Sequence, residues 1–286
     1  MQKTPSIFLG IMACFIITLS FTACKKDSKP STDSDTTAAQ DNAMAESAYT
    51  DANTMVDASV TYGANFSFRV ATNEPAARIE EVLGNCVTVT IDTVNATRSV
   101  VINFGTTNCL CVDGRKRRGR ILANWTGRYR EAGTVVNITY DNYFVNDNQI
   151  KGTHKTTNMG ANNAGNLVYK IEVNGTIVKA NNGGEITWES TRQREWVAGI
   201  NTPLNILDDI YSITGSATGT VASGHAYTIN ITQALVRKMT CNWFESGKIE
   251  LTPEGLATRT LDYGSSGCDA NATVTIGGAT FNVVLP

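Results

Sequence analysis

Apolar residues follow three different spacings along the chain, and each spacing predicts a different kind of segment. A nearly continuous apolar run covers residues 7–19. Apolar and small residues then recur at helical spacing over residues 43–58. From residue 121 onward, apolar and polar residues alternate, most clearly over residues 186–196. The pattern therefore predicts one short N-terminal helix followed by many strands.

Turn signals separate the alternating runs. They are pairs rich in glycine and asparagine, such as Asn174-Gly175 and Gly277-Gly278. Short connections favour antiparallel pairing of consecutive strands. We therefore predict an all-β fold, with a large twisted antiparallel meander or sandwich-like sheet and one short N-terminal helix. Residues 43–286 are expected to form this single β-rich domain, helix included.

The N-terminal apolar run is typical of a signal peptide, because it is too short to cross a bilayer. Lys3 precedes the run, and the small residues Thr22 and Ala23 lead into Cys24. This ending resembles a bacterial lipobox, which implies that residues 1–23 are removed and that Cys24 carries the lipid. Residues 24–42 lack large apolar side chains and are expected to form a flexible tether. Lys25 follows the cysteine, and the resemblance implies an outer-membrane destination, on either the periplasmic or the surface face.

Composition narrows the function classes. The 286 residues include 38 Thr, 26 Asn and only 6 Pro, which favours strands and turns over an all-α fold. Only 17% of residues are charged, and the net charge is −2. A nucleic-acid partner is therefore not expected.

Five cysteines follow Cys24, and an oxidising envelope compartment favours pairing among them. Residues 101–109 (VINFGTTNC) are echoed by residues 260–268 (TLDYGSSGC). If the echo is structural, Cys86 pairs with Cys109 and Cys241 pairs with Cys268, which leaves Cys111 free. The alternative is that such turns recur by chance in β-rich chains.

Several motifs together resemble a family of uncharacterised Bacteroidota cell-envelope lipoproteins. They are residues 103–109 (NFGTTNC), 113–121 (DGRKRRGRI), 141–146 (DNYFVN), 150–153 (IKGT), 192–196 (RQREW) and 261–269 (LDYGSSGCD). The resemblance spans about residues 86–286, and Cys111 departs from it. It implies an envelope protein and supplies no catalytic residue.

Two groups of residues are candidates for binding. Arg115, Arg117 and Arg118 belong to the strongest basic cluster, which could bind an anionic envelope polymer. The favoured interpretation is instead a solvated turn with positive charge along a strand.

Arg192 and Arg194 share an apolar strand face, and Glu131 and His154 fall on inward phases of their strands. These four residues would either line a polar cleft or form satisfied structural ion pairs, and the second interpretation is favoured. The cleft would be needed by the alternative function, an envelope enzyme acting on a glycan.

No motif with catalytic, zinc or cofactor spacing stands out. We expect no catalytic residue, metal or cofactor, and we expect a structural or binding module rather than an enzyme. Its expected partners are the membrane, through the lipid anchor, and a glycan or another envelope protein.

Overall fold

The computed structural model describes residues 2, 33–64, 84, 87–202, 205–265 and 267–286. The expected lipidation site Cys24, the disulfide candidate Cys86 and all but residue 2 of the expected signal peptide lie outside the described residues. Residues 33–286 form one compact unit. Within the described residues, no helix has the length and apolar character that a membrane span requires.

The described residues of this unit form one long helix and fourteen strands. The helix is α1 (Thr37–Ala64), and the strands are β1 (Thr88–Asp92), β2 (Thr97–Asn103), β3 (Cys109–Leu110), β4 (Lys116–Thr126), β5 (Val135–Val145), β6 (Asn148–Ala161), β7 (Leu167–Val178), β8 (Glu185–Ala198), β9 (Ile210–Thr220), β10 (Ala226–Lys238), β11 (Ser246–Pro253), β12 (Arg259–Asp262), β13 (Asn271–Ile276) and β14 (Ala279–Val284). Two short 3₁₀ helices, η2 (Ala180–Asn182) and η3 (Ile206–Asp208), lie in connections.

The strands form a single antiparallel meander. Their order is β1-β2-β4-β5-β6-β7-β8-β9-β10-β11-β12-β13-β14, and β3 pairs with β4 outside this path. Apart from β2 and β3, consecutive strands therefore pair with one another, as short connections favour. The turn predicted at Asn174-Gly175 is wrong, because both residues lie inside β7. The all-β class and the antiparallel meander are confirmed.

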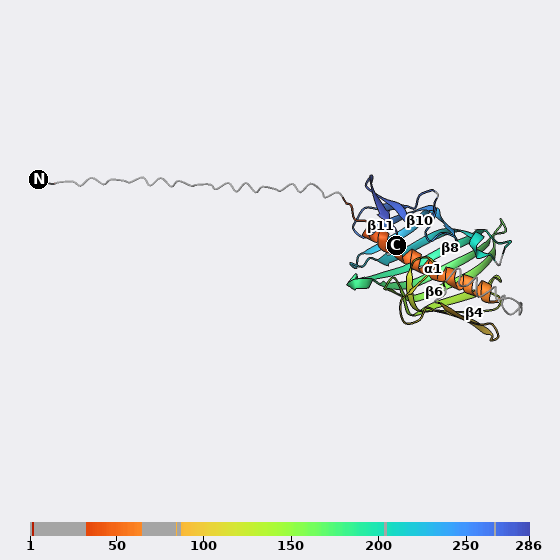
Figure 1. Cartoon of the computed structure of the whole chain (residues 1–286). Coiled ribbons are helices and arrows are strands. Elements are labelled where there is room, and N and C mark those ends of the chain that lie inside the picture. Colours follow the sequence, from red (N-terminus) through yellow and green to blue (C-terminus); the bar gives the residue numbers. More distant parts are fainter. Residues whose placement is uncertain (1, 3–32, 65–83, 85–86, 203–204, 266) are drawn as a thin grey trace. The chain divides into compact units, whose positions relative to one another are not determined.

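The helix lies against one face of the sheet and crosses its strands (Figure 1). It comes closest to β1, β2, β7, β8 and β11. It spans 28 residues, so it begins six residues before the predicted start at Ala43 and continues past Ala58. The predicted tether is wrong over residues 37–42, because Ala38, Ala39 and Asp41 are buried in the helix.

The helix is not amphipathic in the ordinary sense. From Asp41 to Thr61 no residue is exposed, and the half-buried ones form a stripe along one side. The stripe consists of Met44, Ser47, Thr50, Asp51, Thr54 and Asp57. Because the other sides are buried, the sheet must curve around most of the helix.

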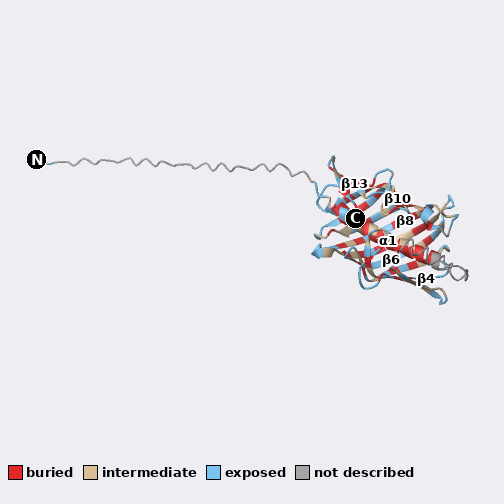
Figure 2. Ribbon diagram, viewed as in Figure 1, coloured by how far each residue is buried: buried red, intermediate tan, exposed pale blue. Residues whose placement is uncertain are grey.

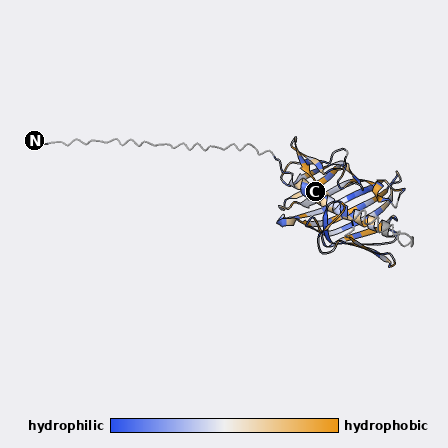
Figure 3. Ribbon diagram, viewed as in Figure 1, coloured by the Kyte–Doolittle hydropathy of each residue, from blue (hydrophilic) through white to orange (hydrophobic). Residues whose placement is uncertain are grey.

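Residues of the strands alternate between the helix side and solvent, as Figure 2 shows in red and blue and Figure 3 repeats in hydropathy. In β8, Ile186, Trp188, Arg192, Arg194 and Trp196 are all buried toward the helix, which confirms the predicted two-faced strand.

A glycine lets the helix approach the sheet closely. The Tyr49 hydroxyl donates to the backbone carbonyl of Lys151 at 2.9 Å, and its ring stacks on Trp188 with centroids 5.5 Å apart. A Cβ at Gly175 would lie only 2.1 Å from the Tyr49 hydroxyl oxygen. Position 175 must therefore lack a side chain for α1 to dock here.

The two echoed segments form the same turn. Gly105 (φ 79°) and Gly264 (φ 91°) each donate their amide to a side-chain oxygen two residues earlier, at 2.9 Å in both. The preceding aromatic residue donates its amide to a glycine carbonyl in a neighbouring strand, at 3.0 Å in both. The echo is therefore structural at the level of the turn.

The disulfide pattern agrees with this repeat as far as it is described. Cys241 and Cys268 are bonded, with Cα atoms 5.5 Å apart. Cys109 is also disulfide-bonded, but its predicted partner Cys86 lies outside the described residues. Cys111 is a free, buried thiol, as expected from its position outside the repeat.

Candidate functional site

The interior between α1 and the sheet contains an unusual number of charged groups. Five arginines are buried there among the described residues: Arg117, Arg192, Arg194, Arg237 and Arg259. Four of them form ion pairs with carboxylates on α1 or just before it. Burying a charge without a partner is costly, so these pairs couple the helix to the sheet.

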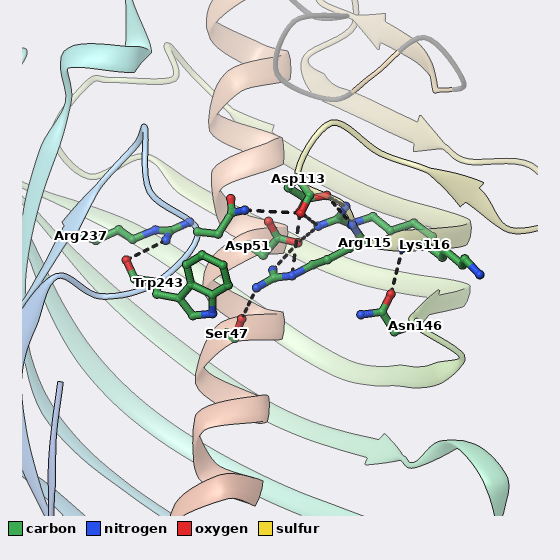
Figure 4. Close-up of polar contacts among 10 residues, drawn as sticks. Ser47, Asp51, Asp113, Arg115, Lys116, Asn146, Arg237 and Trp243 are labelled. Atoms are coloured by element: carbon green, nitrogen blue, oxygen red, sulfur yellow. Dashed lines mark hydrogen bonds and ion pairs between the residues drawn. The ribbon is translucent and has the colours of Figure 1, made fainter. Parts of the chain in front are cut away.

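Arg117 in β4 forms ion pairs with two carboxylates, those of Asp51 and Asp113, which lie beside Arg115 in Figure 4. Its guanidinium donates to Asp51 in α1 and to Asp113 in the preceding turn, with the shortest contact at 2.5 Å to each. Burial acts to raise the pKa of Asp113, but the hydrogen bonds from Arg117 lower it overall. Arg115 joins the same group, because it donates to Ser47 at 2.9 Å and lies 3.6 Å from Asp51.

The favoured interpretation of the basic cluster as a solvated turn is therefore wrong for Arg115 and Arg117. Alternation along β4 directs Arg117 inward, where its side chain is 2% exposed. Arg118 faces outward, pairs with Asp147 and lies 3.8 Å from the centre of the Phe144 ring. The three arginines do not form one basic surface.

In β8 the predicted inward arginines are paired with the helix. Arg192 donates to both carboxylate oxygens of Glu46, at 2.5 and 3.2 Å, and each side chain is 3% exposed. Arg194 donates to Asp57 at 2.8 Å. The structural ion-pair interpretation is confirmed for these two arginines.

His154 lies beside these pairs in β6. Its Nε2 atom is 3.3 Å from the Thr156 hydroxyl, which donates to Asn53 of α1 at 2.7 Å. Complete burial, together with the nearby charge of Arg194, lowers the pKa of His154 to about 3. The imidazole is therefore neutral at physiological pH.

Glu131 does not join this group. It is exposed in the turn between β4 and β5, so its predicted inward phase is wrong. The strand ends at Thr126, before the alternation could direct Glu131 inward. A glycosidase would need two opposed carboxylates in an open cleft. The four predicted side chains do not form such an arrangement.

Sequence reasoning missed a hollow around Arg237 in β10. Its lining comes from α1, the loop after Cys241, the segment after β12 and the C-terminus: Ala43, Ser47, Thr50, Arg237, Asn242, Trp243, Phe244, Tyr263, Leu285 and Pro286. A signal was present, because Arg237 shares the strand phase of the buried Ile229, Ile231 and Leu235.

The opposite face of the sheet carries two adjoining open grooves of about 720 and 470 Å³. They share Glu189 and Thr218, and threonine side chains from five strands, β6 and β8 to β11, line them. These outward residues were predicted only as the polar phase of the strands.

Within the described part of the chain, no group of three or more His, Cys, Asp and Glu side chains could hold a metal ion. Comparison of the sequence with protein-family models and curated proteins, and with solved structures, finds no match.

Proposed function

We propose that the protein is a lipid-anchored outer-membrane protein that acts as a binding module of the cell envelope, with a glycan as its partner. Three kinds of observation support this proposal: the lipobox ending at Cys24, the use of the interior polar residues, and the outer grooves. The motifs that resemble Bacteroidota envelope lipoproteins support the same compartment.

The interior favours a binding role over catalysis. Arg192 and Arg194 are held by carboxylates of α1, and His154 is buried and neutral. Glu131 is exposed elsewhere. Arg192 and Arg194 hold the helix against the sheet, and the four predicted side chains do not come together in the polar cleft that the enzyme alternative would use.

The outer grooves are the single observation that carries the binding role. Thr187, Thr218, Thr228 and Glu189 line the larger groove, and all of them except the half-buried Thr187 are exposed. Hydroxyls and carboxylates match the hydrogen-bonding groups of sugar hydroxyls. The carboxylates favour a neutral glycan over an acidic one.

A glycan array with the full chain tests this role. We expect Thr218→Lys to reduce binding at least tenfold, because a long charged side chain at the shared point would obstruct both grooves. Asn124→Lys is the matched control, since Asn124 is exposed on β4 and lines neither groove. Equal glycan binding by Thr218→Lys and the unchanged protein would contradict the proposal.

A further inference from the structure

The strand β14 forms an edge of the sheet that lacks the usual protection. Its only partner among the described strands is β13, which Figure 2 labels near one end of the sheet. Edge strands normally avoid pairing with other chains through charged side chains, proline or a bulge. The sequence of β14 is ATFNVV, so it contains neither a charge nor a proline. Its pairing with β13 has no register shift, so it contains no bulge either.

The other edge of the sheet is different. It is formed by β1, which ends on Asp92 and therefore carries a negative charge. In β14, Thr280, Phe281, Val283 and Val284 are all residue types that favour strands. Val284 is also 71% exposed. Of the two edges, β14 is therefore better suited to pair with a strand of another molecule.

The hydrogen bonds to β13 determine which backbone groups of β14 point outward. The two-residue turn Gly277-Gly278, with φ of 56° and 89°, joins the strands, so the residues on either side of it form a hydrogen-bonded pair. The same phase continues to Leu285, whose amide donates to the carbonyl of Ala270 at 2.7 Å. The N–H and C=O groups of the alternate residues therefore point away from β13. These residues are Thr280, Asn282 and Val284.

These outward groups are complementary to a second copy of the same strand. Residues that lie opposite each other in an antiparallel pair can exchange both of their backbone hydrogen bonds. A two-fold axis at Asn282 would place this residue opposite Asn282 of the partner subunit, and Thr280 opposite Val284 of the partner subunit. Every outward group of the three residues then has a partner. A shift by two residues would place one of them beyond the end of the other strand.

We propose that two copies of this chain associate through β14, in an antiparallel pair with a two-fold axis at Asn282. A two-fold contact is closed, so it produces a dimer rather than an open chain of subunits. Because β14 carries no charge, the pairing brings no like charges together. On the helix side, the half-buried Phe281 lies opposite Val283 of the partner subunit, which extends the apolar packing across the contact. One strand pair is a small interface, so the dimer is reversible.

Sedimentation of the full chain in density-matched detergent, over a range of protein concentrations, tests the dimer. Asn282→Pro removes an outward N–H and no hydrogen bond to β13, since proline is tolerated in an edge strand where its nitrogen faces away from the sheet. Asn282→Ala is the matched control, because it loses the same side chain and keeps the N–H. We expect the dimer to dissociate at least tenfold more readily in Asn282→Pro, and to change less than threefold in Asn282→Ala.

A pair of charged variants decides if Asn282→Pro does not fold. Asn282 is exposed, so Asn282→Lys and Asn282→Glu should both fold. Each variant alone places like charges opposite each other at the two-fold axis, which weakens the pair, whereas a mixture of the two places opposite charges there. We expect the mixture to associate at least threefold more tightly than either variant alone.

A full chain that stays monomeric at every concentration would overturn the proposal, since a strand of another protein would then be the only possible occupant of β14. Growth beyond the dimer would also overturn it, because this result indicates head-to-tail pairing of β14 with β1. Equal association of Asn282→Pro and Asn282→Ala, or of the charged variants alone and mixed, would do the same. None of these measurements involves glycan binding, so the two proposals fail independently.

Discussion

At the scale of single residues, buried polar side chains in this protein mostly serve to attach α1. His154 shows how strongly the interior acts on an ionisable group, because burial next to Arg194 leaves its imidazole neutral. Its Nδ1 atom has no hydrogen-bond partner among the described residues. Protonation would place a second cation beside Arg194 in a space with little water.

His154 should therefore make folding sensitive to acid. The unfolded imidazole has a pKa near 6.5 and the folded one a pKa of about 3, so only the unfolded chain gains a proton between these values. The contribution to stability is complete above pH 6.5 and is lost as the pH falls toward 3. Urea unfolding measures the free energy of unfolding at pH 7.5 and at pH 4.5. The decrease between these two values should be about 3 kcal/mol smaller in His154→Gln than in the unchanged protein.

His225 is the natural control for this experiment. It is exposed in the turn before β10, so His225→Gln should keep the acid sensitivity of the unchanged protein. Equal slopes of unfolding free energy against pH in all three proteins would show that His154 is protonated in the folded state.

At the scale of elements, the helix and the sheet are joined by carboxylates that point in several directions. Asp41, Glu46, Asp51 and Asp57 are five or six residues apart, which separates them around the axis at about 100° per residue. Their partners Lys179, Arg192, Arg117 and Arg194 lie on β4, on β8 and just after β7. Only a sheet that curves around the helix can meet all four.

Removing one partner of the Glu46–Arg192 pair should destabilise the fold by about 3 kcal/mol, because the other charge would stay buried alone. Glu46→Gln makes this change with little loss of volume, and urea unfolding measures it. The double variant Glu46→Met and Arg192→Met should recover much of the loss. Asp141→Asn, which breaks the exposed pair with Arg120, should change stability by less than about 1 kcal/mol. A similar small effect of Glu46→Gln would contradict the structural role.

The sequence could predict the strands better than the helix. Alternation in residues 186–196 follows directly from packing one face of a sheet, so it survives in a single sequence. The start of α1 could not be predicted, because Ala38 and Ala39 are too small to distinguish a buried helix from a polar tether. The acids of α1 gave no sign of their burial, since their partners come from strands 66 or more residues away.

The candidate site residues also differ in how far the sequence alone could predict them. Arg192 and Arg194 were identified from strand phase, but whether they lined a cleft depended on acids from another element. Arg237 has the same inward strand phase and was overlooked, because only the three-dimensional arrangement reveals that no carboxylate of the described residues forms an ion pair with it. The outer grooves arise from the curvature of paired strands, which no single strand encodes.

At the scale of the whole molecule, the proposed anchor would determine where the proposed binding surface acts. Eight residues separate Cys24 from Asp33, the first residue of the compact unit. An extended chain of this length reaches about 30 Å. A lipid on Cys24 would therefore keep the folded part close to the bilayer.

Cys24→Ala should abolish labelling by a palmitate analogue and release the protein from the membrane fraction, since the thiol that would carry the lipid is gone. Cys111→Ala is the matched control, because this second thiol is buried and free and should leave labelling and fractionation unchanged. Continued lipid labelling of Cys24→Ala would refute the anchor.

The attachment of Asp33 to Arg259 has a mechanical consequence. Asp33 accepts from the buried guanidinium of Arg259 in β12 at 2.9 Å, and the carbonyl of Asp35 accepts from it at 2.8 Å. Force applied to the N-terminal chain therefore acts first on the ion pair between Asp33 and Arg259, and then on α1, which the sheet encloses. The tension does not peel an edge strand bond by bond. Many contacts of α1 must shear together, so the molecule is built to resist force applied from its N-terminal side.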